Sequence, residues 1–558
     1  MSDGIIRGSD GDITYRTRPY VCGAVGEWDP ETFRRLRESS PTGLQELHSG
    51  TTAVLWATGR VSTWAAGESR GFFWGDLAES APPSSWTSVA EQRLAAGLEL
   101  GRDNAVLHTD GLGLQDLYVR RHGGAVYFSV RIDPLLDIVD GGLRTDWTAW
   151  SSIAGVTAPL ADTTPFLEIR RMQAATAWRA EPHRVEALTF EPGWLGCEPN
   201  GKVTPADAAD IVASHVEGAR RQAAITLSGG WDSRLLAILA RRRRRLIAWT
   251  TSNDDGRDRD IDYAQRVARA LRMKHRVFLP GADAWLDEHS AVRQRLNYQT
   301  THHVWIMPLV RALHERQEEF LDGLAGDVLF KSLFVSQEVA NAPSAEHQRR
   351  LLWNSLEQKR LQQRGLLAPG VAAAFEDRSR ASLDDAVSRF AGHPAASTLG
   401  VLHTRTARAI GSSAQWLLAP EVNVRLPFVH PTVIAAALRV PLTAKIGGGF
   451  YRDMLHAANP AVAALPSTND PVKPTGTRAQ RRQANLPALT AMAQAIRGDQ
   501  ATLMLLAPDM RQALKDPDAL ALIGRSSAGL RTLQWASLLG EWRTRYASRL
   551  IDSGFDQG

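Results

Sequence analysis

Cysteine is scarce in this chain. The 558 residues include two, Cys22 and Cys197, which lie far apart in the sequence. Two distant thiols exclude a disulfide framework, and no CxxC pair is present to hold a metal or to act as a redox site. The sequence therefore does not belong to the small, cysteine-dependent classes of protein.

Long apolar segments are missing as well. No run approaches the length of about 20 residues that spans a bilayer. The N-terminal sequence MSDGIIRGSDGD lacks the apolar core of a signal peptide. We therefore expect a cytoplasmic protein with no membrane partner.

A strong excess of charge of one sign is also absent. The net charge of +5, with a sequence pI near 9.3, permits an anionic partner without requiring one. The most concentrated charge is the arginine run 241–245, which directly follows an expected helix. Cations at the C-terminal end of a helix complement its dipole, so a solvated helix end explains the run better than a nucleic-acid patch. We do not expect a nucleic-acid partner.

What the chain does have is the size and composition of a globular protein with two domains. Hydrophobic residues make up 44% and charged residues 22%, which are ordinary values. A chain of 558 residues exceeds what one hydrophobic core usually holds. Near residue 200 the pattern changes from short β-rich runs to alternating helices and strands. We therefore predict two domains, residues 1–200 and 201–558.

The most informative stretch is a glycine turn between a predicted strand and a predicted helix, ITLSGGWDS at 225–233. Adjacent glycines let main-chain N–H groups approach an anion, and the dipole of the following helix favours negative charge. Asp232 stands where a phosphate would lie, as expected of a residue that holds Mg²⁺. A plain turn with a Ser or Asp cap is the alternative. The predicted nucleotide-binding residues here are Leu227, Ser228, Gly229, Gly230, Trp231, Asp232 and Ser233.

The segments around this turn predict a parallel sheet. Helical and strand-like patterns alternate, with helices at 206–221, 233–240 and 262–271 and strands at 224–227, 246–251 and 275–279. Strands that alternate with helices at this spacing form parallel sheets, which bind ligands at the carboxyl ends of their strands. Thr250 and Ser252, at the end of the second strand, should therefore face the same cleft as the glycine turn.

The glycine turn resembles a known family. LSGGWDS is similar to the SGGxDS pyrophosphate loop of the ATP-pyrophosphatase superfamily, and its neighbours resemble the asparagine synthetase branch. That branch contains asparagine synthetases, β-lactam synthetases and lasso peptide cyclases, which join a carboxylate to an amine through an acyl-adenylate. The resemblance implies ATP and Mg²⁺ as cofactors. DGLAGD, at 322–327, looks like the family's SGxGxDE motif, which implies that Gly323 contacts the nucleotide and that Asp327 and Asp232 hold the metal.

Two departures from that motif point to one kind of member. Leu324 stands where asparagine synthetases have glutamate and β-lactam synthetases have tyrosine, and Val328 replaces the second acid. Leucine cannot exchange protons, so the base that accepts the proton of the amine must differ here. The DGLAGD form looks closer to the lasso peptide cyclases.

Residues 1–200 resemble, more weakly, the N-terminal nucleophile hydrolase domain of asparagine synthetases, through the segments 21–30 and 108–139. Strand-like runs and a hairpin at Gly123-Gly124 agree with it. The fold implied is an αββα sandwich followed by a parallel-sheet ATP-pyrophosphatase domain with additional helices. Cys22 could be the glutaminase nucleophile only if 21 residues were removed, and the family's Arg-Gly-Pro-Asp motif is missing. We interpret this domain as degenerate and structural.

Later segments extend the resemblance. APEVNVRLPF, at 419–428, resembles the family's Glu-x-Arg-x-Pro-Phe stretch, which implies that Glu421 and Arg425 serve the reacting centre, with a salt bridge as the alternative. LPSTNDPVKP, at 465–474, resembles the loop of the catalytic lysine, which implies that Lys473 stabilises the charge of the transition state. The charged helical stretch 345–392 fits a substrate lid, a partner surface or ordinary packing.

Together these features predict an ATP-dependent, AMP-forming amide ligase that most resembles a lasso peptide cyclase. Such an enzyme would adenylate an Asp or Glu side chain of a precursor core peptide and close a macrolactam with the peptide's N-terminal amine. A leader peptidase and a leader-binding protein would be its partners. The alternatives are a small-molecule amide synthetase of the asparagine or β-lactam type, an RNA-modifying enzyme with the same loop, and a non-catalytic scaffold.

Overall fold

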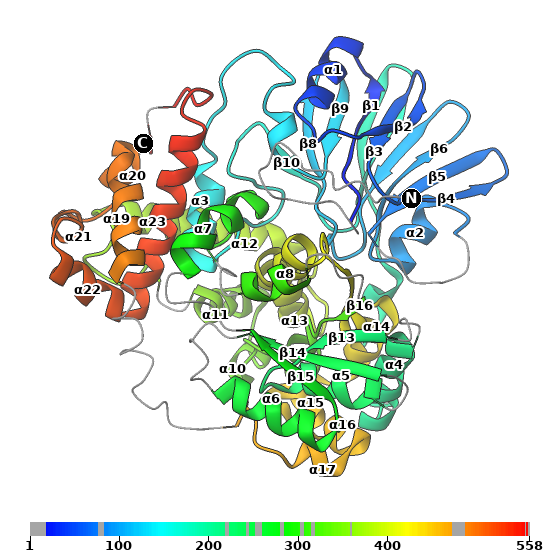
Figure 1. Cartoon of the computed structure of the whole chain (residues 1–558). Helices are drawn as coiled ribbons and strands as arrows, with labels where there is room; N and C mark the ends of the chain where they lie inside the picture. Colours follow the sequence, from blue (N-terminus) through cyan, green and yellow to red (C-terminus); the bar gives the residue numbers. More distant parts are fainter. Residues whose placement is uncertain are drawn as a thin grey trace.

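The computed structural model describes residues 18–75, 83–217, 222–241, 245–251, 259–278, 284–301, 306–313, 319–357, 360–470, 486–552 and 554–555. Figure 1 shows an antiparallel region, in blue and cyan, above a parallel sheet surrounded by helices, in green and yellow. The last helices of the chain, in orange and red, lie beside both. The predicted change of architecture along the chain is thus confirmed.

The antiparallel region contains two sheets of six strands each. The first has the order β10-β8-β9-β1-β3-β2, with bounds β1 Val21–Glu27, β2 Gln45–Ser49, β3 Ala53–Ala57, β8 Tyr118–His122, β9 Gly124–Ser129 and β10 Arg170–Arg171. Strands β8 and β9 pair as the predicted hairpin. Gly123 makes the turn at φ +58°, a left-handed conformation that glycine adopts without strain.

The second sheet faces the first, because β1 contacts β7, β11 and β12. Its order is β12-β11-β7-β6-β5-β4, with bounds β4 Ser62–Ala66, β5 Ser69–Trp74, β6 Ala96–Leu100, β7 Ala105–His108, β11 Thr176–Glu181 and β12 Arg184–Thr189. Phe72 belongs to the main core, whereas Phe73 packs with Val89 of helix α2 (Trp86–Gln92) in a separate cluster. Helix α2 therefore covers the face of this sheet that points away from the main core. The glutaminase-like identity of the region stays a prediction.

Cys22 lies inside this region on β1, and its side chain is completely buried. Burial raises the pKa of its thiol to about 12. Arg18 and Tyr20, which precede it, are buried as well. In this structure the thiol is thus a protonated core group and not an accessible nucleophile.

The second region is built on a sheet of five parallel strands with the order β15-β14-β13-β16-β17. Its bounds are β13 Gln222–Thr226, β14 Arg245–Thr251, β15 Lys274–Phe278, β16 Glu319–Leu321 and β17 Asn423–Arg425. The predicted strands and the helices between them are all found, as α4 Pro205–Glu217, α5 Trp231–Arg241 and α6 Arg259–Ala270. Helices α7 Ala284–Arg295, α8 Met307–Leu313 and α9 Gly326–Lys331 follow.

Further helices surround the sheet and complete the chain. The predicted helical pair at 345–392 is present as α11 (Ala345–Glu357) and α12 (Val371–Ser388), and two π-helical segments follow, η4 (Leu402–Ile410) and η5 (Ser413–Leu418). The others are α10 Gln337–Ala340, α13 Ala396–Val401, α14 Pro431–Arg439, α15 Leu442–Lys445, α16 Gly449–Ala458, α17 Pro460–Ala463, α19 Leu486–Gly498, α20 Gln500–Met504, α21 Pro508–Ala513, α22 Pro517–Arg525 and α23 Ser527–Arg545. In the described part of the chain no single helix is long and apolar enough to cross a membrane, although one pair bent by 99°, Pro431–Arg439 with Leu442–Ala458, passes by length and composition.

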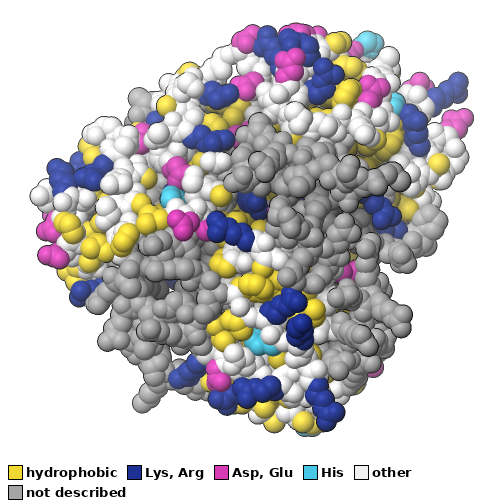
Figure 2. Space-filling view, viewed as in Figure 1, with side chains coloured by type: hydrophobic (Ala, Val, Ile, Leu, Met, Phe, Trp, Pro, Cys, Tyr) yellow, Lys and Arg dark blue, Asp and Glu magenta, His cyan; other side chains and the backbone are white. Residues whose placement is uncertain are grey.

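Residues on the two sides of the boundary near residue 200 pack against each other. Helix α3 (Trp147–Val156) lies within residues 1–200 but packs against α12 and α23. The indole Nε1–H of Trp535 on α23 donates to the backbone oxygen of Trp150 at 3.1 Å. On the face shown in Figure 2, Lys and Arg side chains are spread over both regions together with Asp and Glu.

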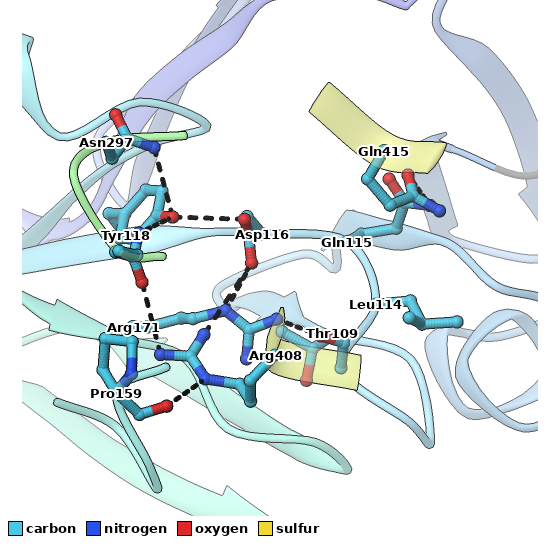
Figure 3. A network of polar contacts seen from close by, with 12 residues as sticks. Thr109, Leu114, Gln115, Asp116, Tyr118, Pro159, Arg171, Asn297, Arg408 and Gln415 are labelled. Carbon is cyan, nitrogen blue, oxygen red and sulfur yellow. Dashed lines mark hydrogen bonds and ion pairs between the residues drawn. The ribbon is translucent and has the colours of Figure 1, made fainter. Parts of the chain in front are cut away.

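A buried polar network joins the two regions. Figure 3 shows Asp116 beside Tyr118 and the guanidinium groups of Arg171 and Arg408. Trp416, on η5, donates its indole N–H to Asp116. The carboxylate comes from the antiparallel region, whereas Arg408 and Trp416 come from the π-helical segments.

Arg131 makes a second buried connection between the regions. It lies just after β9, has no exposed surface, and donates to the backbone oxygens of Gln294 and Arg295 at 2.5 Å each. These carbonyls belong to the last turn of α7, where helix geometry leaves them without intrahelical donors. The antiparallel region therefore completes the hydrogen bonding of a helix in the other region.

Candidate active site

The site lies where the strand order of the parallel sheet reverses. Strands β14 and β15 extend the sheet on one side of β13, and β16 and β17 extend it on the other. Open α/β sheets bind ligands at such a switch point, beyond the carboxyl ends of the strands. The glycine turn follows β13 and the DGLAGD segment follows β16, so the structure brings the two predicted motifs together here.

The glycine turn is folded by its own hydroxyl groups. Ser228 N–H donates to Ser233 Oγ at 3.0 Å, and Gly230 N–H donates to Ser228 Oγ at 3.1 Å. Gly229 N–H donates to Asp260 Oδ1 at 2.8 Å, a use of this acid that the sequence did not indicate. Helix geometry leaves the first-turn N–H groups of α5, which begins at Trp231, without intrahelical partners, so they are the best placed donors for a phosphate.

A second segment holds the turn from outside. Arg234, which is fully buried, donates to the backbone oxygens of Leu465 at 2.7 Å and Pro466 at 2.6 Å. Ser467 Oγ and Thr468 N–H donate to the Gly229 oxygen at 2.9 and 3.0 Å. The chain that leads to the predicted lysine loop therefore lies on the glycine turn. Lys473 itself is outside the described residues.

The end of the second strand is also tied to the turn. The Thr250 hydroxyl is buried and lies 2.5 Å from the Leu227 backbone oxygen and 2.7 Å from His275 Nε2. Leu227 N–H in turn donates to the Trp249 oxygen at 2.8 Å. Thr250 thus positions the turn in this structure. Ser252 lies outside the described residues.

Two aspartates meet at the centre of the site. Asp327 N–H donates to Asp232 Oδ2 at 3.0 Å. Burial and the neighbouring Asp327 charge raise the pKa of Asp232 well above its usual value, and burial also raises the pKa of Asp327. The Tyr451 hydroxyl faces Asp232 and partly offsets this shift, but the two groups do not meet hydrogen-bond geometry. Among the described residues, Asp232 Oδ1 and the Tyr451 hydroxyl have no hydrogen-bond partner.

Glycines let the two motifs approach each other closely. A Cβ at Gly323 would lie 3.0 Å from Asp232 Cβ, and one at Gly326 would lie 2.8 Å from Asp232 Cγ. Between them Leu324 is buried, with its N–H donating to Asp322 Oδ1 at 2.9 Å. A larger residue at either glycine would push the aspartates apart, which is the physical reason for this spacing.

The aspartate pair fits a magnesium ion that is shared with phosphates. In the part of the chain that the structure describes, no group of three or more His, Cys, Asp or Glu side chains could hold a metal. Mg²⁺ is usually held by one or two carboxylates, with waters and phosphate oxygens completing its six ligands. Asp232 and Asp327 supply that number of carboxylates, and the buried, unpaired Oδ1 of Asp232 is an available ligand atom.

Glu421 and Arg425 are ion paired, but not with each other. Glu421 Oε1 lies 3.8 Å from Arg295 Nη1, and Arg425 Nε lies 2.9 Å from Glu319 Oε1. Glu421 precedes β17, whereas the glycine turn and DGLAGD follow their strands. In this structure Glu421 is a buried ion-pair partner two residues before β17, and its role at the reacting centre stays a prediction.

Two cations beside the aspartates were not singled out by the sequence. Lys331 Nζ lies 5.1 Å from the centre of the Trp231 ring, and the Arg405 charge acts on Asp327. Lys331 follows Asp327 by four residues on α9, a spacing that places two side chains on one helix face and could have revealed it. Arg405 comes from η4, a tertiary contact that leaves no local signal.

Comparison with known proteins identifies the region that holds this site. Residues 208–466 match the family model described as asparagine synthase. The match includes both glycine-rich motifs and both aspartates. No curated protein matches the chain. Proteins of this family generally use ATP and Mg²⁺, so the domain implies an ATP-dependent amide ligase.

Proposed function

With an asparagine synthase domain at residues 208–466 as the premise, we propose that the protein is an AMP-forming amide ligase acting on a peptide, as lasso peptide cyclases do. It activates an Asp or Glu side chain of a precursor core peptide with ATP. The N-terminal amine of the same peptide then displaces AMP and closes a macrolactam ring.

The observation that carries the proposal is the aspartate pair beside the glycine turn. Asp232 keeps a buried, unpaired oxygen next to a second carboxylate, an arrangement that costs stability unless a cation joins it. The first turn of α5 lies beside the same pair and favours an anion. A cation site and an anion site side by side fit a magnesium–nucleotide complex.

The reaction proceeds in two displacements. A peptide carboxylate oxygen attacks the α-phosphorus of ATP, and the bond to the β-phosphate oxygen breaks, so pyrophosphate leaves and an acyl-adenylate forms. The amine nitrogen then attacks the acyl carbon, AMP leaves with the bonding electrons, and the amine loses a proton. Holding amine and acyl group together in one peptide supplies much of the rate through proximity.

We assign the following roles to residues of this chain. The first turn of α5, with Ser228 and Ser233, binds phosphate oxygens, and Asp232 and Asp327 would hold Mg²⁺. Bound there, Mg²⁺ would neutralise phosphate charge. We assign Lys473 to the charge that develops in the amide-forming step. Glu421 and Arg425 stabilise the structure around β17, because each forms an ion pair with another buried side chain.

Two features favour a peptide over a small amino acid as substrate. Leu324 is buried, and in the family's SGxGxDE motif asparagine and β-lactam synthetases carry a proton-exchanging residue at this position. Cys22 is buried and protonated, which removes the ammonia source that a glutamine-dependent synthetase needs. A peptide that carries its own amine needs no such source. The partners that follow are a leader peptidase and a leader-binding protein, in the cytoplasm.

A small-molecule amide synthetase is the second candidate, because the matched family model is described as asparagine synthase. The two candidates differ in the amine that each accepts. Free ammonium with aspartate would satisfy the second, whereas the first requires a peptide with an exposed N-terminus.

The test is to incubate the protein with Mg-ATP and either aspartate plus ammonium or a core peptide. AMP is followed by chromatography and the peptide by mass spectrometry. AMP together with the loss of one water from the peptide supports the cyclase. AMP with aspartate alone supports the second candidate, and absence of AMP with every substrate and core peptide offered contradicts the proposal.

A further inference from the structure

Two cations from different elements converge on the aspartate pair. Lys331 ends α9, one turn after Asp327, and its Nζ lies over the Trp231 ring at 5.1 Å. Arg405 comes from η4, which packs against α9. Its Cζ lies 4.7 Å from the centre of the Phe334 ring, in the segment just after α9. Aromatic faces thus hold both side chains in place.

The charges of both side chains act on the aspartates. Burial raises the pKa of Asp327, and the Arg405 and Lys331 charges oppose that rise. Burial and Asp327 raise the pKa of Asp232, and Lys331 again acts in the opposite direction. Burial lowers the pKa of Arg405, whereas Asp327 raises it. The four groups therefore form one electrostatic cluster.

The cluster contains two acids and two cations. Burial disfavours the charged forms of the two acids in the free protein. A divalent cation bound to Asp232 and Asp327 would favour their charged forms and would add positive charge beside Lys331 and Arg405. This positive charge attracts a multiply charged anion, and an arginine fork matches phosphate oxygens especially well.

We propose that Lys331 and Arg405 bind the pyrophosphate that leaves in the adenylation step, a role that rests on the proposed function. When the bond between the α-phosphorus and its bridging oxygen breaks, the electron pair stays on the departing pyrophosphate. The negative charge that gathers there is met by the two fixed cations. They thereby assist the forward step and retain pyrophosphate for the reverse step.

The experiment measures binding of magnesium pyrophosphate to the whole protein by calorimetry, so that no peptide is needed. Arg405→Met and Lys331→Met should each weaken binding about tenfold or more, since each removes a charge-assisted contact. Arg405→Lys should recover part of the loss. Arg378→Met is the matched control. Arg378 lies on α12, and its Cζ is 4.6 Å from the centre of the Phe555 ring, so it also packs on an aromatic face. Its substitution should change binding less than about twofold.

Exchange of labelled pyrophosphate into ATP in the presence of the core peptide gives the second readout. Arg405→Met should raise the pyrophosphate concentration needed for half-maximal exchange more than the ATP concentration. Binding of magnesium pyrophosphate by Arg405→Met that is as tight as wild type, or equal losses in Arg405→Met and Arg378→Met, would overturn the inference. A wild-type protein that neither binds magnesium pyrophosphate nor forms AMP would overturn the proposed function itself.

Discussion

Asp116 and Asp232 are both buried aspartates, but their surroundings shift their pKa values in opposite directions. Burial would raise the pKa of Asp116, but Arg171 and Arg408 bring it below its usual value. For Asp232, burial and the charge of Asp327 act in the same direction and raise the pKa. The first carboxylate is surrounded by donors, whereas the second keeps an oxygen without a partner.

The difference in hydrogen bonding distinguishes a structural contact, at Asp116, from a proposed binding site, at Asp232. A fully paired buried charge is costly to break but needs nothing further, so Asp116 stabilises the contact between the two regions. An unpaired buried charge is a standing cost that a ligand can relieve. We therefore expect Asp116 to contribute to stability and Asp232 to contribute to the proposed binding of a cation.

The largest effect should come from Asp232→Asn, which removes one of the two proposed magnesium ligands. We expect AMP formation to fall on the order of a thousandfold. Because the pKa of Asp232 is raised on folding, its contribution to stability is present below its unfolded pKa and is lost as the pH rises through the folded value. The ion-free variant should therefore unfold at the same temperature as wild type or higher at pH 7, as measured by calorimetry. A lower unfolding temperature would contradict this comparison.

Asp116→Asn should have the opposite signature. It leaves Arg171 and Arg408 buried without their shared counter-charge, so we expect unfolding to become easier by about 3–5 kcal/mol. Urea titration followed by circular dichroism measures this. Asp384→Asn breaks the half-exposed ion pair with Arg349 and serves as the control, with an expected change of about 0–1 kcal/mol. Equal losses in the two variants would show that the network adds no special stability.

Lys445 tests the cost of a buried charge that has no counter-charge among the residues that the structure describes. Its Nζ donates to the Ala437 oxygen at 3.0 Å, and burial lowers its pKa to about 8. Because the folded pKa lies below the unfolded value, the unfolded chain binds more protons than the folded one between the two values, so wild-type stability should increase from about pH 8 to about pH 10. Lys445→Met should be more stable than wild type at pH 7 by about 1–3 kcal/mol and less dependent on pH. Thermal unfolding across that range provides the measurement, and parallel curves for the two proteins would disprove the expectation.

The smallest effect should come from Cys22→Ala, which tests whether the antiparallel region does chemistry. We expect unchanged AMP formation at equal folded protein and a stability loss of about 1 kcal/mol. In the native wild type, iodoacetamide at pH 8 should label Cys197, which is partly exposed, and not Cys22. Mass spectrometry after digestion distinguishes the two sites. Labelling of Cys22 or loss of activity in the variant would restore a nucleophilic role.

Local patterns in the sequence were sufficient for the elements and the two glycine-rich motifs. The alternation of helix and strand after residue 203 predicted the parallel sheet, and the turns after β13 and β16 meet as a parallel topology requires. Contacts between residues far apart in the sequence could not be predicted from local patterns. Arg405, Tyr451 and Asp260 reach the site from elements distant in sequence, and no local pattern marks them.

The prediction for Glu421 rested on the family pattern alone, with one extra residue in the spacing. The structure shows Glu421 ahead of β17 and paired with Arg295. The ion pair with Arg295 is a contact between residues far apart in the sequence, which position in a motif does not reveal. The role of Glu421 at the reacting centre stays a prediction. The roles of Lys473 and Ser252 stay predictions.

Arg131 limits how the two regions of this protein could be combined with regions of related proteins. Because it completes the last turn of α7 from the antiparallel region, a hybrid that joins residues 201–558 to a foreign N-terminal domain would lack that donor. The hybrid would need an arginine at the same place or would lose order in α7. The two regions should therefore be inherited, and exchanged between related enzymes, as one piece.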